Sequence, residues 1–226
     1  MYSYALDVAS ALAYIHRHGI VHLDVKPANI IVTRSDHCKL TDFGCSQRLP
    51  SPDEAAVALQ RVRSWSSSPT KMLNGTLAYR APELLRGEAA TPAADVYSLG
   101  VTLWQMRSRS TPYLGRDQQA VVFAVVAYHD RPDTSPALRR RRSTAARRRS
   151  PAANQSACDG EGPAGGDLAL TPDRQYRDVF RRCWNSDARS RPTAVELVCR
   201  FRSWTTELDS VSSTSSLDTD DVEEYI

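Results

Sequence analysis

Apolar and polar residues are spaced along the chain in ways that predict several helices. In the stretch 4–17, one helical face collects apolar residues and a histidine, namely Leu6, Ala9, Leu12, Ala13 and His16. This spacing predicts an amphipathic helix that ends before Gly19. The stretch 91–106, with Pro92 near its first turn, and the stretch 118–127 are richer in apolar residues and predict two buried helices.

Short runs of apolar and β-branched residues predict strands at 20–21, 30–32 and 38–41. The first two runs flank a polar segment, which we therefore expect to be a loop. Ordered structure is expected again over 176–184 and 193–208.

Three polar segments interrupt this pattern. Residues 46–74 contain three prolines and a serine cluster, and we expect a mobile loop. A basic insert at about 136–170 holds two arginine runs followed by a stretch rich in Pro, Gly and Ala, which cannot bury enough apolar surface to offset its ordering entropy. We expect this insert to be disordered within one domain over 1–208, and the acidic, Ser/Thr-rich tail 209–226 to be disordered as well.

The composition excludes some classes of protein. The hydrophobic fraction of 41% is ordinary for a soluble protein with a core, and no apolar run approaches the roughly 20 residues of a membrane span. Five cysteines without Cys-x-x-Cys spacing favour a reduced, cytoplasmic protein. The net charge is only +3, and the arginine runs lack the interleaved aromatic residues that would stack on bases, so nucleic-acid binding is not favoured.

Four residues within a short length of chain can carry phosphoryl transfer. Asp24 can accept the proton of a substrate hydroxyl, and Lys26 can reach the transferring phosphate. Asn29 and Asp42 offer the hard oxygen ligands that Mg²⁺ prefers. We therefore predict Asp24 and Lys26 as catalytic residues, Asn29 and Asp42 as metal ligands, and Lys26, Asn29 and Asp42 as the residues that bind the nucleotide with its metal.

These residues belong to motifs that resemble the signature set of protein kinases. The matching blocks, in order, are His-Leu-Asp-Val-Lys-Pro-Ala-Asn at 22–29, Asp-Phe-Gly at 42–44, Gly-Thr-Leu-Ala-Tyr-Arg-Ala-Pro-Glu at 75–83, Asp-Val-Tyr-Ser-Leu-Gly at 95–100, Cys-Trp at 183–184 and Arg-Pro at 191–192. The resemblance implies an α+β protein-kinase-like fold, mainly the α-helical C-terminal lobe with short strands around the catalytic loop. It also implies an enzyme that uses ATP and Mg²⁺ to phosphorylate proteins.

The resemblance further implies supporting residues that do not touch the substrate. Glu83 and Arg191 should form a buried ion pair that anchors the activation segment, and Asp95 should hydrogen-bond the backbone around the catalytic loop. His22 and Phe43 should pack in the core and set the geometry of that loop. The remaining supporting positions in these motifs are Gly44 and Thr76.

Lys26 and Thr76 are typical of the serine/threonine branch of the kinases. At Leu23 most regulated kinases carry an arginine that pairs with a phosphate on the activation loop. Leucine has no charge, so we expect activation by another trigger, such as synthesis or a partner. With further blocks at 38–46, 79–85, 102–106 and 124–128, the chain is similar to the Mos serine/threonine kinases over about 3–132 and 175–208. This resemblance implies a protein substrate, MAP kinase kinase, in the MAP kinase cascade of maturing oocytes.

The chain opens on the helix before the catalytic loop, and its sequence contains no Gly-rich loop or strand lysine upstream of that helix. We therefore expect an incomplete kinase domain that is weakly active or inactive alone, with a partly apolar, uncovered face around the loop. A non-catalytic module that binds partners is the alternative. The sequence leaves the oligomeric state open.

Overall fold

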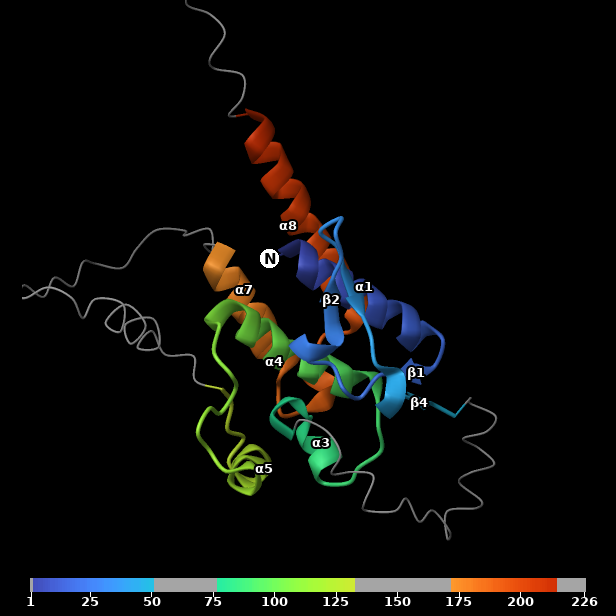
Figure 1. The fold of residues 1–226 in the computed structure, drawn as a ribbon, viewed down its shortest axis with the longest axis vertical. Helices are drawn as coiled ribbons and strands as arrows, with labels where there is room; N and C mark the ends of the chain where they lie inside the picture. Colours follow the sequence, from blue (N-terminus) through green and yellow to red (C-terminus); the bar gives the residue numbers. More distant parts are fainter. Residues whose placement is uncertain (1, 51–76, 133–171, 215–226) are drawn as a thin grey trace, which may run out of the picture.

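The computed structural model describes residues 2–50, 77–132 and 172–214 (Figure 1). The strands are β1 (Ile20–Val21), β2 (Ile30–Val32), β3 (Cys38–Leu40) and β4 (Gln47–Arg48). The α-helices are α1 (Tyr2–Arg17), α3 (Pro82–Leu85), α4 (Pro92–Ser108), α5 (Gln118–Ala127), α7 (Pro172–Cys183) and α8 (Ala194–Thr214). Short 3₁₀ turns are η1 (Pro27–Asn29), η2 (Phe43–Cys45), η4 (Leu77–Tyr79) and η5 (Ala188–Ser190). The described part of the chain is therefore mainly helical with short strands near its start, as the sequence predicts.

The four strands form two antiparallel pairs. β2 and β3 make a hairpin in which Ile30 faces Leu40, and β1 pairs with β4 so that Val21 faces Gln47. The loop between β1 and β2 is thus tied at both ends. The hairpin also brings the end of η1 next to the residues that follow β3.

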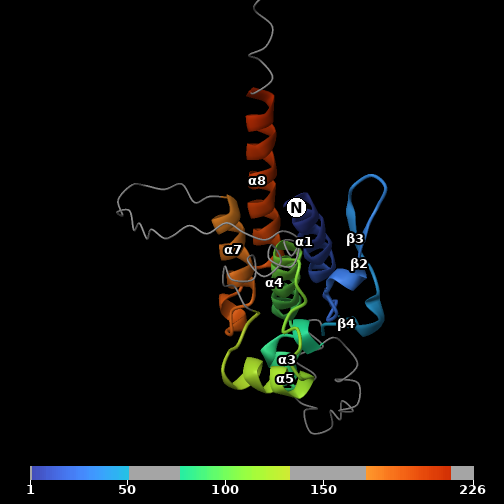
Figure 2. The same cartoon turned by 60° about the vertical axis from the view of Figure 1, so that its left-hand side comes forward.

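The core lies between α1, α4, α7 and α8, which stand side by side in Figure 2, with α3 and α5 beyond one end of them. α1 packs mainly on α8, and α4 packs on α7. Gly100 permits the closest approach of α4 and α7, because a Cβ at this position would lie 2.7 Å from Cβ of Cys183 and 3.0 Å from the carbonyl oxygen of Phe180. Fully buried side chains fill the space, among them Leu12, Tyr97, Leu103, Tyr176, Phe180, Leu197 and Phe201.

The predicted helices form, but several details differ: α1 begins at Tyr2 rather than at 4, and α7 begins at Pro172 rather than at 176. Every residue of α4 from 94 to 104 is buried, as predicted. α5 has the predicted bounds but is buried on one face only, because Phe123 is 61% exposed while Val121 and Val125 are buried. α8 continues to Thr214, so the predicted end at 208 is wrong by one and a half turns.

Several predictions concern residues that lie outside the described ranges. These are most of the predicted mobile loop, the basic insert, and the tail beyond Thr214. At the start of the predicted mobile loop, Gln47 and Arg48 pair with β1 as strand β4, so the prediction is wrong for these two residues. Among the described helices, none is long and apolar enough to cross a membrane.

Candidate active site

The backbone of the catalytic loop is fixed by one buried carboxylate. Leu23 has φ of +64°, which is uncommon for a residue with a side chain. Asp95, fully buried in the first turn of α4, accepts hydrogen bonds from the amide of His22 at 2.8 Å and from the amide of Leu23 at 2.7 Å. His16 of α1 lies 2.8 Å from the same carboxylate through Nε2. The end of α1, the loop and the distant start of α4 therefore meet at Asp95, which holds the loop in its strained turn.

The ring of His22 links this loop to the segment after β3. Its Nε2 donates to the carbonyl oxygen of Thr41 at 3.0 Å, and its Nδ1 lies 3.3 Å from the amide of Asp24. Because a carbonyl can only accept, the neutral tautomer with the proton on Nε2 satisfies both contacts. Phe43 touches the edge of this ring, with centroids 4.8 Å apart, but it is 45% exposed. The prediction that Phe43 packs in the core is wrong, because nearly half of this residue is open to solvent.

Asp24, Lys26 and Asn29 form a compact polar cluster. Lys26 Nζ and Asn29 Nδ2 donate to the same oxygen of Asp24, Oδ2, at 2.7 and 2.9 Å. Asn29 Nδ2 also donates to the carbonyl oxygen of Asp24 at 2.8 Å. Within the described part of the chain, Oδ1 of Asp24 accepts no hydrogen bond. The carboxylate is thus fixed through one oxygen and keeps the other as a proton acceptor, with its side chain 12% exposed.

The predicted metal ligands lie at neighbouring positions of the hairpin. Asn29 accepts two hydrogen bonds at its carbonyl oxygen from Thr41, at 2.9 Å from the amide and 3.1 Å from the hydroxyl, and Asp42 follows directly. Since Nδ2 of Asn29 donates both of its hydrogen bonds to Asp24, Oδ1 of Asn29 remains available as a metal ligand. Asp42, with φ of +63°, accepts the amide of Gly44 on Oδ1. Two side-chain oxygens, one of them charged, fit the ligand preference of Mg²⁺.

Gly44 lies within the turn 43–45, where little room is left for a side chain. A Cβ at this position would lie 3.1 Å from Oδ1 of Asp42, which is closer than an ordinary van der Waals contact. A larger residue would therefore displace the carboxylate from its hydrogen bond with the amide of residue 44.

Glu83 and Arg191 form a buried, bidentate ion pair that joins α3 to the segment before α8. The two guanidinium nitrogens donate to the two carboxylate oxygens at 2.6 and 2.8 Å. Arg191 also donates to the carbonyl oxygens of Ala93 and Asn185, at 2.9 and 2.8 Å, and lies over the ring of Tyr97 at 5.0 Å. Every part of this arginine head therefore contacts a partner that favours its charge.

The structure shows two contacts that the sequence did not indicate, and one predicted site residue lies outside the described ranges. The contact of His16 with Asp95 was not predicted, although a polar side chain within an apolar helical face was the available signal. The contact of Arg191 with Tyr97 had no local signal in the sequence. Arg131 also lies over the ring of Tyr97, at 5.1 Å from its centroid. Thr76 lies outside the described residues.

Comparison of the sequence with models of known protein families identifies the family of this chain. The model of the protein kinase domain matches residues 1–201, so the chain belongs to the protein kinase family.

Within that family, the chain is similar to Mos kinases. It is 38% identical to the proto-oncogene serine/threonine-protein kinase mos of Sus scrofa over 205 residues, which is 91% of this chain and 47% of that protein. It is 40% identical to the serine/threonine-protein kinase mos of Xenopus laevis over 198 residues, covering 88% and 45%. The corresponding protein of Patiria pectinifera is 38% identical over 196 residues, covering 86% and 44%. The predicted resemblance to Mos kinases is confirmed, and the chain spans a little under half the length of these relatives.

Proposed function

We propose that this chain carries the catalytic loop of a Mos-type serine/threonine kinase, which transfers the γ-phosphoryl group of ATP to a protein hydroxyl. The observation that carries the proposal is the carboxylate of Asp24. One of its oxygens is held by Lys26 and Asn29, and the other is left open on a loop with a fixed, strained backbone.

Each residue of the cluster has a distinct task in this reaction. The hydroxyl oxygen of the substrate attacks the γ-phosphorus of ATP and displaces ADP, and Oδ1 of Asp24 accepts the hydroxyl proton. Lys26, whose Nζ is 2.7 Å from Oδ2 of Asp24, brings a positive charge to the phosphoryl oxygens on which negative charge develops. Asn29 and Asp42 would hold Mg²⁺, which would neutralise phosphate charge. The contacts of Asp95 keep these groups in place without touching the substrate.

The substrate and the place of the reaction follow from the resemblance to Mos kinases. We propose MAP kinase kinase as the protein substrate, within the MAP kinase cascade of maturing oocytes. The cytoplasm is the proposed location, and it is supported by the four cysteines of the described ranges, which are all free thiols. The measurement is phosphate incorporation into recombinant MAP kinase kinase compared with an unrelated basic protein. Equal incorporation into both proteins would remove the support for this substrate.

The test of the catalytic assignment compares two aspartate substitutions in the chain of residues 1–226. We expect slow transfer of labelled phosphate, reduced by a further factor of about 10²–10⁴ in Asp24→Asn, because a general base is lost. Asp36→Asn is the control, since this residue also has positive φ and lies in an exposed turn away from the loop. Transfer that is insensitive to Asp24→Asn would refute the assignment.

A second candidate function is a module that binds a partner without catalysis. It is favoured by the apolar side chains of Ile31 and Val32, which are 54% and 52% exposed on the β2 strand, together with the exposed Phe43. Stabilisation by Mg-ATP distinguishes the two functions, because a ligand at 100 times its Kd adds about 2.7 kcal/mol to the free energy of unfolding. If Mg-ATP produces neither stabilisation nor transfer, the binding module is the better description.

Regulation of this site should differ from that of kinases with an arginine at position 23. Leu23 packs against the core and carries no charge that could pair with a phosphate. We expect activity that does not depend on phosphate in the activation segment, and Leu23→Arg should introduce that dependence. Equal dependence of both proteins after phosphatase treatment would contradict this expectation.

A further inference from the structure

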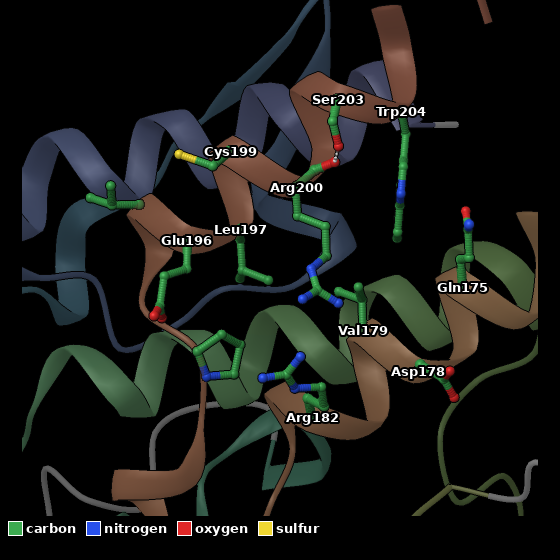
Figure 3. Close-up of a pocket in the computed structure, with 12 residues that line it drawn as sticks. Gln175, Asp178, Val179, Arg182, Glu196, Leu197, Cys199, Arg200, Ser203 and Trp204 are labelled. Atoms are coloured by element: carbon green, nitrogen blue, oxygen red, sulfur yellow. Dashed lines mark hydrogen bonds between the residues drawn. The ribbon is translucent and has the colours of Figure 1, made fainter. Parts of the chain in front are cut away.

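A groove of about 620 Å³ lies between α7 and α8. Its floor is apolar, with Val179 of α7 facing Leu197 of α8, and the indole of Trp204 stands at one end (Figure 3). Val179 and Leu197 are each 1% exposed, so the floor belongs to the core while the walls are open to solvent. An apolar side chain from another segment or molecule could therefore enter the groove and pack on its floor.

Two arginines supply the charge of this groove. Arg182 of α7 and Arg200 of α8 extend into the space between the helices from opposite sides (Figure 3). Within the described ranges, neither guanidinium makes a hydrogen bond or an ion pair. Two like charges that share one groove without a carboxylate partner indicate a site for an anionic group.

The two carboxylates that line the groove are not paired with its arginines in the described part of the chain. Glu196 closes a capping box at the start of α8: its Oε2 accepts the amide of Thr193 at 2.7 Å, and the hydroxyl of Thr193 accepts the amide of Glu196 at 3.2 Å. These bonds, followed by the charges of Arg182 and Arg200, lower the pKa of Glu196. Asp178 also lines the groove, but within the described ranges it forms no ion pair with either arginine. The positive charge of the groove therefore remains available.

The chain itself contains a segment whose chemistry matches this groove. Directly after α8, residues 215–226 contain both acidic and apolar side chains. The acidic residues are Asp218, Asp220, Asp221, Glu223 and Glu224, and the apolar ones are Leu217, Val222, Tyr225 and Ile226. Carboxylates for the two guanidiniums and apolar side chains for the floor thus occur together.

The distance along the chain permits this contact. Arg200 lies fourteen residues before Thr214, which is about 21 Å along a helix at 1.5 Å per residue. Nine extended residues from Thr214 to Glu223 span about 30 Å at 3.3 Å per residue. Glu223 and Glu224 can therefore reach Arg200 with several ångströms of slack. Because the segment is tethered, its effective concentration at the groove is in the millimolar range.

We propose that the acidic segment 218–224 binds in the groove between α7 and α8 of the same chain, with its carboxylates paired to Arg182 and Arg200. The segment then covers the groove and its exposed rim residue Cys199. This inference concerns binding alone and does not depend on kinase activity.

The test measures how fast iodoacetamide alkylates Cys199 in the full chain, with each cysteine followed separately by peptide mass spectrometry. A variant with Asp220, Asp221, Glu223 and Glu224 changed to Asn or Gln should react about three- to tenfold faster at Cys199. Arg200→Glu should have the same effect. A new carboxylate beside a thiol disfavours the reactive thiolate and would by itself slow the reaction, so a faster reaction reports exposure.

Two further variants make the test specific. Arg202→Glu is the matched control, because Arg202 is exposed on the same helix but does not line the groove, and it should leave the rate unchanged. Arg200→Glu combined with Glu223→Arg and Glu224→Arg reverses the charge on the groove and on the segment together. This variant should therefore restore the slow reaction of Cys199. Protection should also disappear at 1 M salt, where the Debye length is about 3 Å.

Three results would overturn the proposal. The first is an equal rate at Cys199 in the full chain and in the acid-neutralised variant. The second is a rate at Cys199 that is unchanged in Arg200→Glu but faster when the arginines of 139–142 and 147–149 are changed to glutamine. This result would show that the acidic segment pairs with those arginine runs. The third is protection that increases with protein concentration, which would assign the contact to a second copy of the chain.

Discussion

The buried ion pair between Glu83 and Arg191 offers the sharpest test of how the site is held. The side chains are 8% and 0% exposed, and residues 108 positions apart are joined by two hydrogen bonds. Glu83→Ala removes the carboxylate but leaves the guanidinium buried between two carbonyl oxygens and the ring of Tyr97. We expect this substitution to destabilise the whole fold, because α3 and the segment before α8 lose their common anchor.

The magnitude can be worked out from the lost contacts. Two charge-assisted hydrogen bonds contribute about 1.5–3 kcal/mol each, and breaking a buried pair by removing one partner costs about 3–5 kcal/mol. We therefore expect Glu83→Ala to lower the free energy of unfolding by about 3–5 kcal/mol. Glu83→Gln keeps one acceptor for Arg191 and should lower it by about half as much.

Urea unfolding followed by far-UV circular dichroism provides the assay, with the free energy extrapolated to zero urea. The matched control is Glu88→Ala, which removes the glutamate of an exposed pair with Arg86, 55% and 36% exposed. Exposed pairs contribute about 0–1 kcal/mol, so this control should change stability little.

A double substitution tests the coupling of the two residues. Glu83→Ala with Arg191→Met removes both charges, so its loss should be smaller than the sum of the two single losses by at least about 1 kcal/mol. A loss below about 1 kcal/mol for Glu83→Ala, or losses that simply add, would refute the view that a buried charge is compensated here.

Three further predictions concern the core and the surface. Gly100→Ala should lower the free energy of unfolding by about 1–3 kcal/mol in the same urea assay, because the new methyl group overlaps Cys183; an unchanged midpoint would contradict the close packing of α4 on α7. Burial raises the pKa of Cys183 to about 12, so iodoacetamide at pH 8 should leave it unmodified in the folded chain while Cys199 reacts, and equal labelling of both would show that the core is open. Partial burial favours a higher pKa for Asp173, but hydrogen bonds and charges from two arginines, one of them Arg107, outweigh it and lower the pKa below the usual 3.8. Asp173→Asn should therefore lower the free energy of unfolding by about 0.5–1 kcal/mol at pH 7, since this carboxylate is 41% exposed. The difference in stability between the two proteins should vanish as pH falls from about 4 through the lowered pKa, and a difference that persists at pH 2 would contradict the ionic origin.

The local chemistry of the loop was predictable because it is made by neighbours in the chain. Asp24, Lys26 and Asn29 lie within five positions, and their hydrogen bonds follow from one short turn whose residues allow few other arrangements. The exposure of Phe43 was not predictable in the same way. An apolar residue in a motif indicates a packing role, but how much of its ring is covered depends on which segments lie beside it.

The sequence by itself determined the order of the elements, the bounds of α5, and the placement around one loop of the four residues that we predict to carry phosphoryl transfer. Hydrophobic periodicity and turn chemistry act over a few residues, so these features are encoded locally. Tertiary structure alone decided that His16 and Asp95 would meet under the loop, that one face of α5 would stay exposed, and that Arg182 and Arg200 would share a groove. These features depend on how helices pack across 18 to 79 positions of sequence, because a side chain is buried or paired only when a distant element reaches it.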